Sequence, residues 1–409
     1  MKNKLIKYAL LFLSLMAAFF FFAVISCSLP DKAVKKHVSK EAPTMQEQGD
    51  YPTAIIHITE CRQDNFTDAL ILNQIYSVDR KHPFKSAMEV PSGYYDPSYD
   101  ASGSLLKTVN QEPGGKTMKY SRYWHGSTFL FRIFLIFVDY PVLQWLLFAI
   151  SSLLLALFVC TYYARAGMWK TAAFLLSWLL VYGFIMQFSM QFFPVLALSL
   201  LASTLVVRHE EDTSYLSVLF FVIACLTCYF DILTDPLLTF GWPLVVWISL
   251  QRSDKLRHRD NLWNIIKWGS LWSAGYALTF LFKWGIGSLI LGENVLQDAS
   301  NAMMYRIGTE DYSRWDAIVR NWEMIPGDFV VISVIVLLAV SLLHFKSDGW
   351  FKAVLLLVVA LMPFVWYLVL ANHSYLHFWF TYRIQAITLS ALFLSALSLH
   401  RKDSSKQWD

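Results

Sequence analysis

Two carboxylates, Asp64 and Asp68, stand four residues apart in the segment Asp64–Leu70, which leads into the helix-like stretch Thr67–Tyr76. Residues four apart share one face of a helix, so both side chains point the same way if this helix begins early enough. A carboxylate beside a membrane-bound donor can act as a general base and take a proton from an acceptor hydroxyl. The structural alternative is a helix cap or a solvated side chain. We take Asp68 and Asp64 as the candidate catalytic residues.

A second group of candidates is basic. The segment NHSYLHFWFTYR contains His373 and His377 and ends in Arg383. These three side chains can hold a phosphate by charge-assisted hydrogen bonds. The aromatic residues between them are equally typical of an interfacial belt. Lys283, deep in an apolar stretch, is either a further anion contact or a lysine that snorkels to the interface.

Other polar residues lie near the ends of apolar stretches. Asp231 and Asp235 stand between two of them, where carboxylates cap the next helix, face water or line a polar cavity. Arg306 lies in a separate loop and is a candidate phosphate ligand. His125 belongs to RYWHGS (Arg122–Ser127), which is either a docking seam or part of a substrate groove. These four residues complete the candidate substrate-binding set.

Most of the chain that positions these residues must lie in a membrane. The 409 residues are 56% apolar and only 16% charged, whereas a soluble domain is typically about 25% charged. This excess excludes an ordinary soluble enzyme. The net charge of +4 comes from 34 basic and 30 acidic residues, which is too balanced to indicate a nucleic-acid partner. No nucleotide-phosphate loop, dinucleotide fingerprint or H-E-x-x-H zinc motif is present.

The apolar stretches predict an all-α polytopic membrane protein with about ten transmembrane helices. They cover residues 8–26, 142–162, 170–187, 192–207, 215–230, 236–250, 262–290, 329–344, 351–371 and 384–400. Basic residues concentrate in the segments that this count places inside, which puts both termini in the cytoplasm of a cell membrane. The stretches between 192 and 250 are short, which suits tilted, paired or re-entrant helices.

The remaining composition divides the chain into parts. These are an N-terminal transmembrane anchor at 1–28, an extracytoplasmic loop domain at 29–127, an interfacial helix at 128–141, a multispan membrane domain at 142–400 and a cytoplasmic tail at 401–409. The loop domain is predicted to be small, mixed or mainly helical, and to lean on the membrane portion. Cleavage and lipidation at Cys27 is the alternative for the anchor, because Val24-Ile25-Ser26-Cys27 also fits a bacterial lipoprotein signal.

This layout resembles the membrane glycosyltransferases of the GT-C fold, which begin with one span and a large outer loop that carries an acidic catalytic residue. The stretches YWHGS (Tyr123–Ser127), FDILTDPLLTFGWP (Phe230–Pro243) and NHSYLHFWFTYR (Asn372–Arg383) also resemble uncharacterised bacterial multispan proteins of this group. In typical members the acidic residue follows the first span closely, whereas the Asp64 and Asp68 pair comes later.

The resemblance implies transfer of a sugar from a polyprenyl-phosphate donor, held among membrane lipids, to a cell-envelope glycan acceptor on the outer face. Asp68 or Asp64 would be the base, and Arg383, His377 and Arg306 would neutralise the donor phosphate. Some relatives use a divalent metal ion and others do not. The competing class is a non-catalytic membrane protein: a lipid or solute transporter or scrambler with a cavity at Asp231 and Asp235, or an envelope-assembly partner.

Overall fold

The computed structural model describes residues 2–55, 58, 61–309, 312–343 and 349–399, so the expected tail at 401–409 lies outside the described residues. The described chain is mainly helical and has one two-stranded sheet, which is consistent with an all-α membrane protein. Its first half contains α1 (Lys2–Ser28), α2 (Lys32–Gln48), α3 (Asn65–Tyr76), α4 (Pro83–Glu89), β1 (Pro91–Tyr95), α5 (Ala101–Val109), β2 (Lys116–Lys119), α6 (Gly126–Phe134), α7 (Tyr140–Ala166), α8 (Met168–Leu180), η1 (Gly183–Gln187) and α9 (Phe193–Arg208). The second half contains α10 (Thr213–Phe230), α11 (Leu238–Leu250), α12 (Ser253–Leu256), α13 (Arg259–Leu291), α14 (Val295–Ile307), α15 (Arg314–Trp322), α16 (Gly327–Leu343), α17 (Trp350–Ala360), α18 (Met362–Val369), α19 (Ala371–Leu376), α20 (Phe378–Thr381), η3 (Tyr382–Ile384) and α21 (Gln385–Ser398).

Six helical segments of the described chain are long and apolar enough to cross a membrane. They are Leu5–Ser28, Tyr140–Ala166, Thr213–Phe230, Arg259–Leu291, Trp350–Val369 and Phe378–Ser398. Four further apolar helices, α8, α9, α11 and α16, are shorter. Each of the ten apolar stretches of the sequence therefore contains a helix, and the chain has the features of a multi-pass membrane protein.

Several of these helices differ from the expected stretches at their ends. The stretch 351–371 breaks into α17 and α18 just before Pro363, whose ring nitrogen carries no hydrogen for the helical bond. The stretch 170–187 ends as a helix at Leu180, and η1 follows after Tyr182, whose φ is +51°. The segment 372–383, expected as an outer turn, consists of the short helices α19 and α20 and the first residues of η3.

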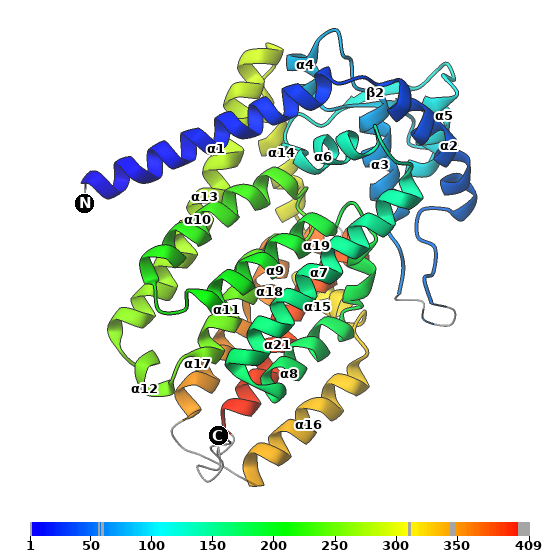
Figure 1. Ribbon diagram of the computed structural model, residues 1–409. Coiled ribbons are helices and arrows are strands. Elements are labelled where there is room, and N and C mark those ends of the chain that lie inside the picture. Colours follow the sequence, from blue (N-terminus) through cyan, green and yellow to red (C-terminus); the bar gives the residue numbers. More distant parts are fainter. Residues whose placement is uncertain (1, 56–57, 59–60, 310–311, 344–348, 400–409) are drawn as a thin grey trace.

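The loop domain sits at one end of the helical bundle, and α12, the start of α17 and the last described residues lie at the other end (Figure 1). The predicted helix at Thr67–Tyr76 is present as α3, which packs between α2 and α5. The strands β1 and β2 pair antiparallel, from Pro91 opposite Lys119 to Tyr95 opposite Lys116.

The predicted interfacial helix is shorter and more enclosed than expected. It corresponds to α6, which packs against α1, α3 and α10 and has no exposed side chain. Its Arg132 is fully buried and donates hydrogen bonds to the backbone oxygens of Ser26 and Leu29, the latter at 3.0 Å. These carbonyls belong to the C-terminal end of α1, where backbone oxygens lack helical partners and a cation is favourable.

A seam of hydrogen bonds joins the loop domain to α13. The indole nitrogen of Trp124 donates to the Thr279 oxygen at 3.0 Å, and that of Trp284 donates to the Arg122 oxygen at 2.9 Å. The Lys283 ammonium is buried and donates to the Met88 oxygen at 2.9 Å, at the C-terminal end of α4. Lys283 therefore contacts a helix end, instead of holding an external anion or snorkelling. The stretch at 122–127 forms this docking seam, and Arg122 and Tyr123 within it also line a groove.

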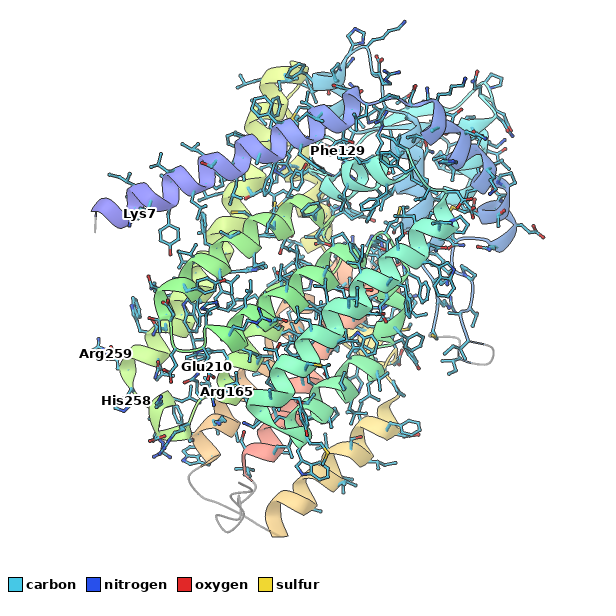
Figure 2. The ribbon with its side chains drawn as sticks, viewed as in Figure 1. Lys7, Phe129, Arg165, Glu210, His258 and Arg259 are labelled. Carbon is cyan, nitrogen blue, oxygen red and sulfur yellow. The ribbon has the colours of Figure 1, made fainter. Side chains whose placement is uncertain are left out.

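The end of the bundle remote from the loop domain is lined by charged side chains. Figure 2 shows Arg165, Glu210, His258 and Arg259 at this end, far from Phe129 of α6. The Arg165 Nε lies 2.5 Å from a carboxylate oxygen of Glu210.

Candidate functional site

An apolar groove of about 430 Å³ lies between α13, α14 and α18. Its walls include Phe280 and Trp284 of α13 and Trp366 of α18. Leu281 and Met303, which also line it, are about half exposed (52% and 48%). These exposed apolar side chains open the groove to the side of the bundle, where a bilayer would surround the protein.

A polar cavity of about 300 Å³ adjoins this groove. Arg122, Ala302 and Arg306 line both spaces. The polar cavity is completed by His373, Leu376 and His377 on one side and by Asp298, Asn301 and Tyr305 of α14. A long apolar space thus ends at a polar chamber with two arginines at the junction.

The two arginines are held by one aromatic ring. The guanidinium carbons of Arg122 and Arg306 lie 5.5 and 5.6 Å from the centre of the Tyr123 ring, within the range of cation–π attraction. Arg122 has one carboxylate partner, Asp298, at 3.4 Å, and Arg306 donates to the Ala302 oxygen at 3.1 Å. The Nε atoms of both arginines are buried and have no hydrogen-bond partner among the described residues. The junction is therefore electropositive and can take an anion.

His373 and His377 face each other across 4.9 Å between ring centres. The Nε2 of His373 lies 3.0 Å from the Leu233 oxygen, so this nitrogen carries the hydrogen and Nδ1 is an acceptor in the neutral ring. Burial lowers the pKa of His373 well below its usual range, with neighbouring His377 and Arg306 acting in the same direction. Burial also lowers the pKa of His377, to about 4. Both imidazoles are neutral at pH 7, and their Nδ1 atoms have no partner among the described residues.

The turn that carries Asp231 holds the Leu233 carbonyl in place. The Asp231 carboxylate accepts from the backbone nitrogens of Leu233 and Thr234 at 3.0 Å each, which forms an Asx-type turn. Leu233 has φ = +75°, a strained value for a residue with a branched side chain. Burial raises the pKa of Asp231 to about 6. Asp231 therefore shapes this turn and, at 1% exposure, does not face water.

Asp235 and Arg383 are buried away from the groove and the polar cavity. Asp235 is fully buried, neither carboxylate oxygen has a hydrogen-bond partner among the described residues, and Arg383 is the cation that acts on it. Burial raises the pKa of Asp235 well above its usual range. Arg383 is 1% exposed, donates to the Trp379 oxygen at 3.0 Å and lies 4.4 Å from the centre of the Phe192 ring. Neither residue lines the polar cavity or the groove.

Asp68 is saturated with hydrogen bonds. It is 2% exposed and accepts from the Tyr140 hydroxyl at 2.8 Å, the Ser189 hydroxyl at 3.1 Å, and the backbone nitrogens of Met190 and Gln191 at 3.2 and 3.3 Å. Burial raises its pKa to about 6, and these donors oppose the shift. Through these hydrogen bonds Asp68 docks α3 against the starts of α7 and α9.

Asp64 caps α3. Its carboxylate accepts from the Thr67 backbone nitrogen at 2.9 Å and from the Thr67 hydroxyl at 3.1 Å. Burial raises its pKa to about 7. Asp64 thus has the helix-capping role that was considered from the sequence. A catalytic role for Asp64 or Asp68 stays a prediction.

His125 lies behind the polar cavity without lining it. It is 1% exposed, its two ring nitrogens have no partner among the described residues, and its ring packs edge-on against Tyr120 and Tyr123. Burial lowers its pKa well below the usual range, so the ring is neutral. The next residue, Gly126, lies so close to the Tyr229 ring that a Cβ would come within 2.3 Å. His125 thus packs between the rings of Tyr120 and Tyr123 and supports the position of Tyr123.

The structure brings together three of the predicted phosphate ligands, Arg306, His373 and His377, and leaves out Arg383. It adds Arg122 and Asp298, which sequence reasoning did not select. Arg122 had a signal, since it is a basic residue in an outer segment that was already considered as a groove. Asp298 had none beyond its charge. No group of three or more His, Cys, Asp or Glu side chains in the described chain could hold a metal ion, so we derive no step through one.

Comparison with known proteins leaves this arrangement to be interpreted from its chemistry. No protein-family model, no curated protein and no solved structure matches the chain. What the geometry offers is an amphiphilic site: an apolar groove open to the side of the bundle, two cationic side chains at its end, and a chamber with hydrogen-bonding groups beyond them.

Proposed function

We propose that this chain is a glycosyltransferase-like membrane protein that takes a sugar from a polyprenyl-phosphate donor and transfers it to a cell-envelope acceptor on the outer face. The observation that carries the proposal is the junction of the two spaces at Arg122 and Arg306. A lipid-linked sugar phosphate has the same order of parts: an apolar chain, an anion and a polar head.

The groove suits the chain of the donor because it is apolar and opens sideways. A polyprenyl chain already dissolved in the bilayer would enter past Leu281 and Met303 without crossing water. Its phosphate would then contact Arg122 and Arg306, whose buried Nε atoms have no hydrogen-bond acceptor among the described residues. Charge-assisted hydrogen bonds to such groups are roughly twice as strong as neutral ones.

The same arginines would assist the reaction itself. Breaking the bond between sugar and phosphate leaves added negative charge on the phosphate, and fixed cations stabilise charge that develops in the transition state. A phosphate bound nearby would raise the pKa values of His373 and His377, because an anion stabilises a protonated imidazole. While the two imidazoles remain neutral, their Nδ1 atoms can accept hydrogen bonds from sugar hydroxyls.

We place the site on the outer side of the cell membrane, with the ten apolar helices as ten spans and both termini in the cytoplasm. The four shorter helices would be tilted or paired within the bundle. Support comes from the basic side chains at the end remote from the loop domain, where Figure 2 shows Arg165 and Arg259.

Binding of a phosphate-bearing lipid tests the proposal. The full-length protein in nanodiscs is titrated with a C20 polyprenyl phosphate and with the corresponding alcohol, and bound lipid is counted by native mass spectrometry. We expect the phosphate to bind at least about tenfold more tightly than the alcohol, and Arg306→Ala to remove that difference, since a charge-assisted hydrogen bond contributes about 1.5–3 kcal/mol.

Arg80→Ala is the matched control, because Arg80 is an arginine of the loop domain with an exposed ion pair to Asp31 and no part in either space. It should bind both lipids as the wild type does. Equal affinity of the wild type for phosphate and alcohol, or undiminished phosphate binding by Arg306→Ala, contradicts the proposal.

Catalysis needs its own test. Deletion of the gene should remove a sugar modification from the envelope glycans, and a wild-type copy should restore it. A deletion strain with an unchanged glycan profile contradicts the enzyme and leaves a non-catalytic lipid-binding protein.

A further inference from the structure

We infer that Asp298 is the general base that deprotonates the acceptor hydroxyl in the polar cavity. This assignment rests on the proposed function. It differs from the sequence-based choice of Asp68 or Asp64, and it follows from where each carboxylate lies relative to the two spaces.

Asp298 is the one carboxylate, among the residues that the structure describes, that lines the polar cavity. It lies in the first turn of α14, beside Asn301 and on the same helix as Arg306. Its side chain is 48% exposed, so an acceptor can reach it from outside and a proton can leave. A general base must lie within hydrogen-bond reach of the proton that it takes.

The oxygens of Asp298 are more accessible to an acceptor than those of the other four candidate carboxylates. Its one ion pair is the 3.4 Å contact with Arg122. By contrast, Asp64, Asp68 and Asp231 accept short hydrogen bonds from fixed donors of their own surroundings. Asp235 has unoccupied oxygens, but it is fully buried and lines neither space.

Donor binding would free Asp298 further. A phosphate at the junction competes with Asp298 for the guanidinium of Arg122, because both anions need the same donors. The carboxylate released from this weak contact stays in the cavity wall, since α14 is held by its own cap: the Asn294 side chain accepts from the Gln297 nitrogen at 3.0 Å.

The step balances with the groups present. The acceptor oxygen forms a bond to the anomeric carbon of the sugar, and its proton passes to a carboxylate oxygen of Asp298. The bond between that carbon and the phosphate oxygen breaks, and both of its electrons remain on the polyprenyl phosphate, beside Arg122 and Arg306. Asp298 then releases the proton to the outer solution.

Asp298→Asn tests this role, because the amide keeps the shape of the side chain and cannot take the proton. In the deletion strain, we expect this variant to restore the envelope glycan at least about 100-fold more slowly than the wild type, the usual minimum contribution of a general base. In nanodiscs it should bind the C20 polyprenyl phosphate within about threefold of the wild type and unfold at the same temperature.

Glu293→Gln is the matched control. Glu293 stands just before α14 and forms an ion pair with Lys119 of the loop domain at 2.5 Å, so its loss removes a similar tie without touching the cavity. It should restore the glycan fully. If Asp298→Asn restores the glycan at the wild-type rate, or if Glu293→Gln fails as badly, Asp298 is not the base. Loss of phosphate binding by Arg306→Ala together with full activity of Asp298→Asn would overturn this inference alone and leave the proposed function standing.

Discussion

Asp68 binds donors from two helices far apart in the sequence, and this explains why a carboxylate lies buried there. Tyr140 begins α7, while Ser189, Met190 and Gln191 precede α9. Removing a buried hydrogen-bonded carboxylate leaves its donors unsatisfied, at about 1–3 kcal/mol for each such group. A variant of Asp68 that loses activity is therefore informative only where its folding is measured as well.

Asp64 gives a prediction about pH. Its folded-state pKa of about 7 lies above the ordinary value of 3.8, so its contribution to folding is fully present below pH 3.8 and is lost as the pH rises from 3.8 to 7. Asn caps helices as well as Asp does. Asp64→Asn should unfold at nearly the wild-type temperature at about pH 3.5 and at a higher temperature than the wild type at pH 8, measured by thermal unfolding in detergent.

Asp79 provides the control, because its pKa is shifted in the opposite direction from that of Asp64. It is exposed, and its hydrogen bond with His82 lowers its pKa, so Asp79→Asn should not gain stability at pH 8. If Asp64→Asn shows the same pH dependence as the wild type, Asp64 does not titrate as a buried group.

At the scale of elements, α13 connects the loop domain to the groove. Thr279 and Lys283 of α13 form hydrogen bonds with Trp124 and with the C-terminal end of α4. The neighbouring residues Phe280 and Trp284 line the groove. The helix therefore transmits the position of the loop domain to Arg122, whose backbone oxygen accepts from Trp284. The site depends on this docking.

Lys283→Met tests the docking. The variant loses a charged hydrogen bond to the last turn of α4, which contributes about 1.5–3 kcal/mol. Because about 1.4 kcal/mol is a factor of ten in an equilibrium constant, amide hydrogens of residues 83–90 should exchange about 10- to 100-fold faster, as measured by hydrogen exchange with mass spectrometry.

Lys267→Met is the matched control, since Lys267 is the other lysine of α13 and lies about 24 Å from Lys283, nearer the start of the helix. Its variant should leave exchange at 83–90 unchanged. Unchanged exchange in Lys283→Met would mean that α4 docks without this lysine.

At the scale of the whole molecule, the two ends of the bundle differ in content. The loop domain and both spaces lie toward one end, and the basic side chains around Arg259 lie at the other. Positive charge is retained on the cytoplasmic side during insertion, so this asymmetry predicts the orientation.

Cysteine labelling measures this orientation. Cys160 is the one exposed cysteine of the chain, so the Cys160→Ser variant should have no cysteine that reacts readily with the maleimide. On that background, Lys81→Cys in the loop domain should react with a membrane-impermeant maleimide in intact cells, and Arg259→Cys should react only after permeabilisation. The reverse pattern would place the cavities in the cytoplasm and contradict an outer-face enzyme.

Much of the architecture was predictable because lipid imposes a simple rule on sequence. A segment in hydrocarbon must satisfy its own backbone, so each long apolar stretch became a helix. His373, His377 and Arg383 were grouped because they are close together in the sequence. Between His377 and Arg383 the chain passes through α20 into η3, so closeness in sequence does not fix the direction of the side chains. Arg383 accordingly lines neither the groove nor the polar cavity.

The sequence by itself determined that this is a helical membrane protein with its unusual polar residues gathered between apolar stretches. Only the tertiary structure decided which of them meet. Arg122 and Arg306 are 184 positions apart and share the ring of Tyr123, while Asp298 joins them because α14 packs against α13. Helix periodicity sets the face on which a residue lies, whereas contacts between helices are set by packing over the whole bundle. The polar cavity is built from three segments far apart in the sequence and therefore leaves no local pattern in the chain.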